Sequence, residues 1–482
     1  MAVNSRHFIC CALVEGKERL SVEDFASSNR KIKQNKENNL TFKAIMQAEY
    51  RQRRQQLMAK LGSSTAIFRS APMAVMHSDV EYNFRQDSDF FYLTGFNESN
   101  AVAVLAPHHE EHQFVLFVQP KDPEKETWTG YRTGVDAAKA EYGADEVYPI
   151  AELNEHLPQY LAQADRIYYH LGRDRNFNQT ILNHWQRLLS KYPKEGVGPV
   201  AIEDPITILP PLRVVKSDQE LATLRKAIEI SVEAHNLARD MAQPGRYEYE
   251  IQAEMERLFR LKGGVGPAYP SIVASGFNAC ILHYTENNRQ LQDDDLLLID
   301  AGCSYDYYNA DITRTFPVNG RFTPEQKILY ELVLEAQIQA INQVQPGNPI
   351  NAYHDAAVRV LTEGLVDLGL LVGDVDKLIE EETYKPFYMH RTGHWLGLDV
   401  HDAGPYKQDK ENWLPFQPGQ VITVEPGLYI GLDIQLAEDQ PEVPERWRGI
   451  GIRIEDDVLV TAAGHDVLTK AVPKAVETLE QA

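Results

Sequence analysis

The stretches LLLIDAG at 296–302 and DITRTF at 311–316 decide the fold of this chain. The first is apolar up to Asp300, which predicts a buried strand with a carboxylate at its end. The second is a β-branched, strand-forming run that begins at Asp311. The residues between are numerous enough for a hairpin, so Asp311 is expected to return beside Asp300. One such aspartate is usually a turn or cap residue, but two on neighbouring strands favour a shared site, because a buried carboxylate requires a partner.

Two further apolar runs end in carboxylates. VITVEPG at 421–427 places Glu425 where a strand ends, and the proline and glycine behind it terminate that strand. GIRIE at 451–455 belongs to a strand expected over 451–459, and its period-two alternation puts Arg453 and Glu455 on one face. An exposed Arg–Glu pair is an alternative interpretation of this last motif.

Three histidines lie in HRTGHWLGLDVHD at 390–402, namely His390, His394 and His401. A single histidine in such an apolar stretch is usually a core residue, but three together favour a site. With the carboxylates they give an oxygen-rich donor set without thiolate. Such a set suits two divalent ions such as Mn²⁺, Co²⁺ or Fe²⁺ better than a structural zinc site, and a pair of ions can share a hydroxide nucleophile.

Composition excludes several classes of protein. The chain has 482 residues, 43% hydrophobic and 24% charged, which predicts a globular protein of two or three domains. Acidic residues outnumber basic ones by 70 to 48, which disfavours nucleic acid or anionic membranes as partners. No run approaches the roughly 18 apolar residues of a membrane span. Four cysteines without a C-x-x-C pair indicate a reducing compartment, the cytoplasm.

The order of patterns divides the chain into three parts. Residues 1–45 are polar and aperiodic, which predicts a mobile extension, or alternatively a gene start placed too early. Residues 46–212 alternate short apolar runs with helical segments and are expected to form an α/β domain. Residues 213–475 are expected to be α+β, with helices opening at Ser217 in a capping box and at Thr323 before Pro324.

These motifs resemble the pita-bread metallopeptidases and, more narrowly, bacterial Xaa-Pro aminopeptidase (aminopeptidase P). The similarity extends over roughly residues 48–470. The matching stretches are 281–287, 298–302, 311–316, 394–402, 425–429 and 449–457. Residues 82–96 resemble the leading domain of aminopeptidase P and prolidase, which methionine aminopeptidases lack. The resemblance implies an α+β fold: a pita-bread (creatinase/aminopeptidase-like) catalytic domain behind a smaller α/β domain.

The resemblance also implies a metal site. Asp311 and Glu455 would bridge two divalent ions, with Mn²⁺ expected. Asp300 would complete the coordination of one ion, and His394 and Glu425 would complete the coordination of the other. Metal-assisted hydrolysis would release the N-terminal residue of peptides with proline in second position, and Glu425 would handle the proton.

Further residues match the family's substrate site. His283, His390 and His401 would line it, with His283 and His401 also catalytic and His401 stabilising the tetrahedral intermediate. Arg453 matches an arginine behind the ligands and is grouped with the substrate-binding residues. Trp128 is similar to an aromatic residue that closes a neighbouring subunit's pocket, which implies a homo-oligomer, either dimer or tetramer. Ordinary domain packing is the alternative for Trp128.

Two alternatives remain open at this point. Prolidase, which cleaves only dipeptides, shares most of these motifs, and a pita-bread fold can also serve as a non-catalytic binding protein. Residues 391–393 between two of the histidines differ from the family's usual pattern, but no expected ligand is affected.

Overall fold

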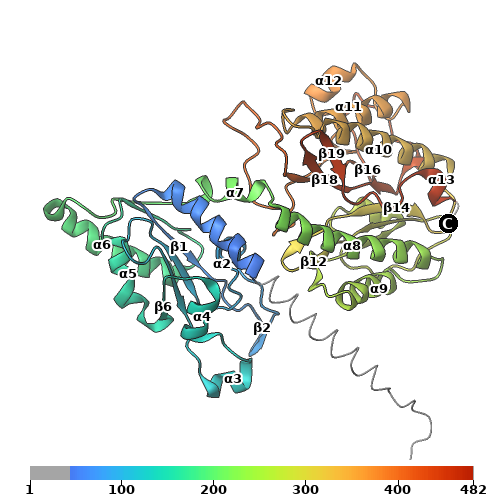
Figure 1. Cartoon of the computed structure of the whole chain (residues 1–482). Helices are drawn as coiled ribbons and strands as arrows, with labels where there is room; N and C mark the ends of the chain where they lie inside the picture. Colours follow the sequence, from blue (N-terminus) through green and yellow to red (C-terminus); the bar gives the residue numbers. More distant parts are fainter. Residues whose placement is uncertain (1–43, 481–482) are drawn as a thin grey trace, which may run out of the picture.

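The computed structural model describes residues 44–480, and the expected extension over 1–45 lies almost entirely outside them. The described chain forms two lobes, with α7 (Pro210–Val214) between them (Figure 1). Among the described residues, no helix has the length and apolar character needed to cross a bilayer.

A six-stranded mixed sheet is the centre of the N-terminal lobe, in the order β6-β5-β4-β1-β7-β8. Its strands are β1 Thr65–Arg69, β4 Val102–Leu105, β5 Phe114–Val118, β6 Glu146–Pro149, β7 Arg166–Tyr168 and β8 Ala201–Glu203. A short hairpin, β2 Val75–His77 with β3 Val80–Glu81, stands apart from this sheet.

Helices cover both faces of this sheet because successive strand residues alternate between two cores. Phe68 packs with a first core that includes Leu57 of the helix over 44–61, whereas Ile67 packs with a second core that includes Leu157. The helices of this lobe are 44–61, α2 Ser88–Thr94, α3 Pro123–Thr129, α4 Gly134–Tyr142, α5 Leu153–Leu161 and α6 Arg175–Glu195.

The C-terminal lobe consists of small antiparallel sheets backed by long helices. Its sheets are β10-β11-β14, β13-β12-β9, β15-β18-β19 and β16-β17. The strands are β9 Gly266–Pro267, β10 Ile272–Ser275, β11 Leu296–Asp300, β12 Cys303–Tyr305, β13 Tyr308–Asn309, β14 Thr313–Pro317, β15 Val421–Val424, β16 Gly427–Ile430, β17 Ile450–Arg453, β18 Asp456–Thr461 and β19 Gly464–Val467. The helices are α8 Asp218–Met241, α9 Glu248–Leu261, α10 Pro324–Gln343, α11 Ala352–Asp367, α12 Val375–Glu380 and α13 Val476–Leu479. The expected α+β class is confirmed.

Two expected helix starts are present. Ser217 accepts a hydrogen bond from the Glu220 N–H and the Glu220 side chain returns to the Ser217 backbone, which is a capping box. Thr323 caps α10 in the same way, with Pro324 in the first turn. α8 packs against β12 and β13, whereas α10 packs against β15, β16 and β17, next to Glu425 and Glu455.

Two expectations about strands are wrong in detail. The connection from Asp300 to Asp311 is not a simple hairpin, because it contains β12 and β13, which pair with each other in a separate sheet. β11 and β14 are antiparallel neighbours, but Asp300 pairs with Thr313. Gly302 makes the tight return possible, since a side chain there would collide with the Ala310 carbonyl.

The expected single strand over 451–459 is also divided. β17 pairs with β16, β18 pairs with β15, and Ile454 and Glu455 lie between them. Side-chain alternation predicted the faces, but it carries no information about which strand is the partner. The break places Glu455 at the junction of two sheets.

Candidate metal centre and substrate pocket

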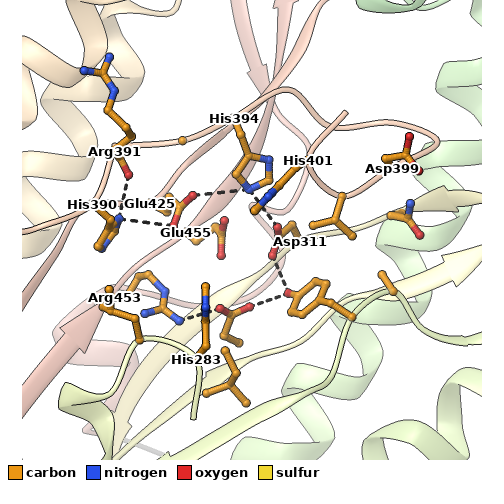
Figure 2. Close-up of a pocket in the computed structure, with 18 of the residues that line it drawn as sticks. His283, Asp311, His390, Arg391, His394, Asp399, His401, Glu425, Arg453 and Glu455 are labelled. Carbon is orange, nitrogen blue, oxygen red and sulfur yellow. Dashed lines mark hydrogen bonds and ion pairs between the residues drawn. The ribbon is translucent and has the colours of Figure 1, made fainter. Parts of the chain in front are cut away.

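A cavity of about 1230 Å³ opens in the C-terminal lobe, where the strand ends with carboxylates meet. All five expected ligands line it: Asp300, Asp311, His394, Glu425 and Glu455. Ligand atoms of Asp311, His394 and Glu455 lie within 4.8 Å of one another, which is close enough for one ion to contact all three. Figure 2 shows these side chains converging from separate segments of the chain.

Asp300 and Asp311 are joined by one tyrosine. The Tyr269 hydroxyl lies 2.6 Å from Oδ1 of Asp300 and 2.5 Å from Oδ1 of Asp311, and it can donate to either. On its other side, Asp300 accepts a hydrogen bond of 2.6 Å from the Arg453 guanidinium. These donors fix the orientation of both carboxylates.

Threonines of the neighbouring strands orient the two glutamates. The Thr313 hydroxyl donates to Oε2 of Glu455 over 2.6 Å, and the Glu455 N–H donates to the Thr313 carbonyl. The Thr423 hydroxyl lies 3.4 Å from Oε1 of Glu425. β14 and β15 therefore supply both the position and the hydrogen bonds of the carboxylates.

His394 presents one nitrogen to the carboxylates. Its Nδ1 donates to the Trp395 carbonyl over 3.0 Å, so Nε2 is free to accept a proton or a metal ion. Nε2 lies 3.4 Å from Asp311 and 3.6 Å from Glu425. The residue before it must be glycine, since a side chain on Gly393 would collide with the Thr423 carbonyl.

The electrostatics of the cluster call for cations. Burial raises the pKa of Asp300 and raises that of Glu425 to about 7. Burial also raises the pKa of Glu455 well above its usual range, and the charges of the neighbouring carboxylates raise it further. Burial alone would lower the pKa of His394, but the hydrogen bond to Asp311 and the charge of Glu425 raise it to about 9. Buried carboxylates this close cannot all be charged without compensation. Oxygen donors and one imidazole fit divalent metal ions.

Three more histidines of the cavity surround this cluster. His283, His390 and His401 all line it, and the His401 ring lies 4.1 Å from that of His394 between centroids. His390 bonds the Tyr429 hydroxyl over 2.8 Å, and the same hydroxyl accepts from Arg453 over 3.0 Å. Burial, with the charge of Arg453, lowers the pKa of His390 to about 3, and burial also lowers that of His401.

Other expected site residues are placed differently. Arg453 and Glu455 do face the cavity together, at 3% and 2% exposure, so the alternative of an exposed pair is wrong. The carboxylate that Arg453 contacts is Asp300, not Glu455. Trp128 lies in α3 with 86% of its surface exposed and does not line the cavity of its own chain.

Three groups that hold the expected ligands were not predicted from the sequence. Thr313 and Tyr429 are buried in this network, and Tyr269 is half-buried. Thr313 and Tyr429 lie close in sequence to Asp311 and Glu425, so position was a usable signal for them. Tyr269 lies in an irregular segment before β10, where no pattern singles it out.

Paired carboxylates and an imidazole in an open cavity, on two sheets of an α+β lobe, define the class of this protein as a metallohydrolase of the pita-bread fold. Comparisons with known proteins narrow the class. The model of metallopeptidase family M24 matches residues 222–462, and that of the aminopeptidase P N-terminal domain matches residues 50–168.

The similarity to individual relatives extends over nearly the whole chain. Xaa-Pro aminopeptidase of Haemophilus influenzae is 43% identical over 90% of this chain and 96% of its own. Among solved structures, Pseudomonas aeruginosa aminopeptidase PepP is 49% identical with a TM-score of 0.85, covering 90% of this chain and 97% of that one. A zinc-substituted Escherichia coli aminopeptidase P in complex with product is 42% identical with a TM-score of 0.84, covering 90% and 97%.

The chain therefore belongs to metallopeptidase family M24 and, within it, to the Xaa-Pro aminopeptidases. It is a metallo-exopeptidase.

Proposed function

We propose that this enzyme releases the N-terminal residue from peptides whose second residue is proline. The observation that carries this is the convergence of Asp300, Asp311, His394, Glu425 and Glu455 in one cavity. The identity of 43% with Xaa-Pro aminopeptidase over nearly the whole chain supports the same substrate class. No observation favours a prolidase.

The five residues are proposed as ligands of two divalent cations, with Mn²⁺ expected. When bound, the cations polarise the scissile carbonyl and lower the pKa of water so that a nucleophile is available near neutral pH. Asp311 and Glu455, whose oxygens lie within 4.8 Å of each other and of His394, are proposed as the ligands that both cations would share.

The remaining side chains handle the peptide. Glu425 is proposed to accept and return a proton during hydrolysis. His283, His390 and His401 are proposed to bind substrate, with His283 and His401 acting at the reacting bond. An Xaa–Pro bond has no N–H, so recognition must come from the shape of the cavity and from such side groups.

Assembly, location and domain limits are proposals as well. Trp128 and Tyr131, at 86% and 94% exposure, are large aromatic side chains that a homo-oligomer, dimer or tetramer, would cover.

Cys280 and Cys303 are free thiols, which fits the cytoplasm. The sheet arrangement supports an N-terminal domain over 46–212 and a catalytic domain over 213–475.

The test is an N-terminal release assay with Arg-Pro-Pro peptides on the metal-loaded enzyme, with the dipeptide Arg-Pro for comparison. We expect release from the longer peptides, no turnover after exhaustive chelation, and none in Asp300→Ala at unchanged circular dichroism. Cleavage limited to the dipeptide would identify a prolidase instead. Full activity of the metal-free protein would refute the metal site.

A further inference from the structure

The wall of the catalytic cavity carries a second group of side chains, apart from the ligands. Arg391, Lys407 and Trp413 all line the cavity. The Arg391 guanidinium carbon lies 5.3 Å from the centroid of the Trp413 ring, and Lys407 Nζ lies 4.5 Å from the same ring. Both distances are within the range of a cation–π contact. We call these three residues the cationic shelf.

A short loop structure holds the shelf in place. Lys407 and Trp413 face each other in an isolated β-bridge, and the Leu414 N–H donates to the Tyr406 carbonyl over 3.0 Å. Trp413 is half-buried, whereas Arg391 and Lys407 are exposed toward the cavity mouth. In Figure 2 the Arg391 side chain points away from Glu425 and Glu455, so it is not directed at the metal site.

The two charges of the shelf are only partly compensated by the protein, since Lys407 interacts electrostatically with nearby Asp409. Arg391 donates to the amide oxygen of Asn351, and Lys407 donates to a backbone carbonyl over 3.1 Å. Within residues 44–480 neither forms an ion pair with a carboxylate. The other two arginines of the cavity do: Arg453 contacts Asp300 at 2.6 Å and Arg85 contacts Asp399 at 3.1 Å.

This arrangement is unexpected in such an acidic chain. With 70 acidic and 48 basic residues, a cation on the surface finds a carboxylate easily. Two like charges beside one indole repel each other, and an anion bound to both would relieve that repulsion. A guanidinium and an ammonium together are well suited to a carboxylate, since the first binds it in two places and the second as a point charge.

We propose that the cationic shelf binds a carboxylate of the peptide downstream of the scissile bond. This rests on the proposed function, because a peptide with its amino end at the metal site has its free carboxylate on the far side. The cavity, at about 1230 Å³, exceeds the roughly 300–1,000 Å³ of small-molecule sites and has room beyond a dipeptide. The carboxylate is the free C-terminus in a short substrate or an acidic side chain in a longer one.

Two matched substrate pairs distinguish these sources. Ala-Pro-Leu and its C-terminal amide differ only in the terminal carboxylate, and Ala-Pro-Glu-amide and Ala-Pro-Gln-amide differ only in the side chain. The metal-loaded full chain is compared with Arg391→Gln, Lys407→Gln and the control Lys410→Gln. The control removes a positive charge from the same loop but outside the cavity lining.

We expect wild type to prefer the charged member of at least one pair. Arg391→Gln and Lys407→Gln should each reduce that preference about tenfold, through KM rather than kcat, because a charge-assisted contact is lost. Lys410→Gln should retain the preference, and added salt should weaken it in wild type. A preference confined to the Glu/Gln pair would assign the shelf to acidic side chains.

Equal turnover within both pairs by wild type, or a preference unchanged in both shelf variants, would overturn the proposal. Binding provides a separate readout, because Pro-Leu and Pro-leucinamide lack an Xaa–Pro bond. Calorimetric titration should show tighter binding of Pro-Leu to wild type than to Arg391→Gln. If wild type cleaved no Xaa-Pro peptide but kept this difference, the proposed function would fail while the shelf would stand. Loss of the difference would refute binding of a free C-terminus by the shelf, and together with equal turnover of the Glu/Gln pair it would refute the shelf as a whole.

Discussion

The Arg213 guanidinium lies 2.8 Å from a carboxylate oxygen of Asp399, two residues before His401. The same guanidinium contacts Asp89 of the N-terminal lobe at 2.7 Å and also pairs with Asp402. These contacts of Arg213 therefore connect α7, the N-terminal lobe and the loop that carries His401. At 3% exposure, Arg213 is almost completely removed from water.

Arg213→Met should lower the free energy of unfolding by about 3 kcal/mol, because it leaves buried carboxylates with fewer partners. This loss of unfolding free energy is at the low end of the range for breaking a buried ion pair, since Lys216 still contacts Asp402 and His170 still contacts Asp89. The midpoint of urea unfolding measures it. Arg225→Met is the control: its pair with Asp466 is exposed, so a loss below about 1 kcal/mol is expected. Equal losses in both variants would contradict the role of burial.

Tyr269→Phe should weaken metal binding about ten- to a hundredfold without unfolding the protein. The hydroxyl contacts Asp300 and Asp311 at 2.6 and 2.5 Å, and groups that orient ligands typically matter to this extent. Calorimetric titration of the metal-free enzyme with Mn²⁺ measures the affinity. Tyr249→Phe, at a residue that is 50% exposed, serves as the control. An affinity within twofold of wild type would exclude this role.

His235 should make the enzyme less stable as the pH falls. Burial lowers its pKa from 6.5 to about 4; its Nε2 donates to the Ala301 carbonyl over 2.8 Å, and its Nδ1 has no partner among the described residues. The unfolded chain therefore takes up the proton first, and stability is lost between pH 6.5 and pH 4. The slope from this one group is about 1.4 kcal/mol per pH unit.

Urea midpoints measured across that pH range test this expectation. His235→Gln keeps a donor near Ala301 but cannot be protonated, so its pH dependence should be flatter than that of wild type. Parallel curves for the two proteins would show that His235 is protonated equally in the folded and unfolded states.

Trp128→Ala should raise KM for an Xaa-Pro peptide about tenfold if this residue closes a neighbouring subunit's cavity, since a covered tryptophan is often an energetic centre of an interface. The fold of the single subunit should not change, because the side chain is 86% exposed in its own chain. Steady-state kinetics measure KM, circular dichroism checks the fold, and sedimentation velocity on the same samples reports the state of assembly. A wild-type KM in Trp128→Ala would rule out the proposed contact.

The expected metal ligands could be selected from the sequence because each lies in a recognisable local pattern. Asp300 and Glu425 end the apolar runs that became β11 and β15, and the cost of an unpaired buried carboxylate made them candidates. His394 stood out through its glycine-bearing, histidine-rich stretch. The strand that was expected to contain Glu455 is broken there, because alternation does not specify which strand is the partner.

The amino-acid sequence by itself determined the α+β class, the helix starts at Ser217 and Thr323, and the carboxylates at strand ends, since burial, capping and alternation are local properties. Only the tertiary structure decided that Tyr269 reaches both aspartates, that Arg453 contacts Asp300, and that Arg391 and Lys407 meet at Trp413. Apart from Lys407 and Trp413, which share one loop, these contacts join segments far apart in the chain, and no local periodicity records which distant side chains packing brings together.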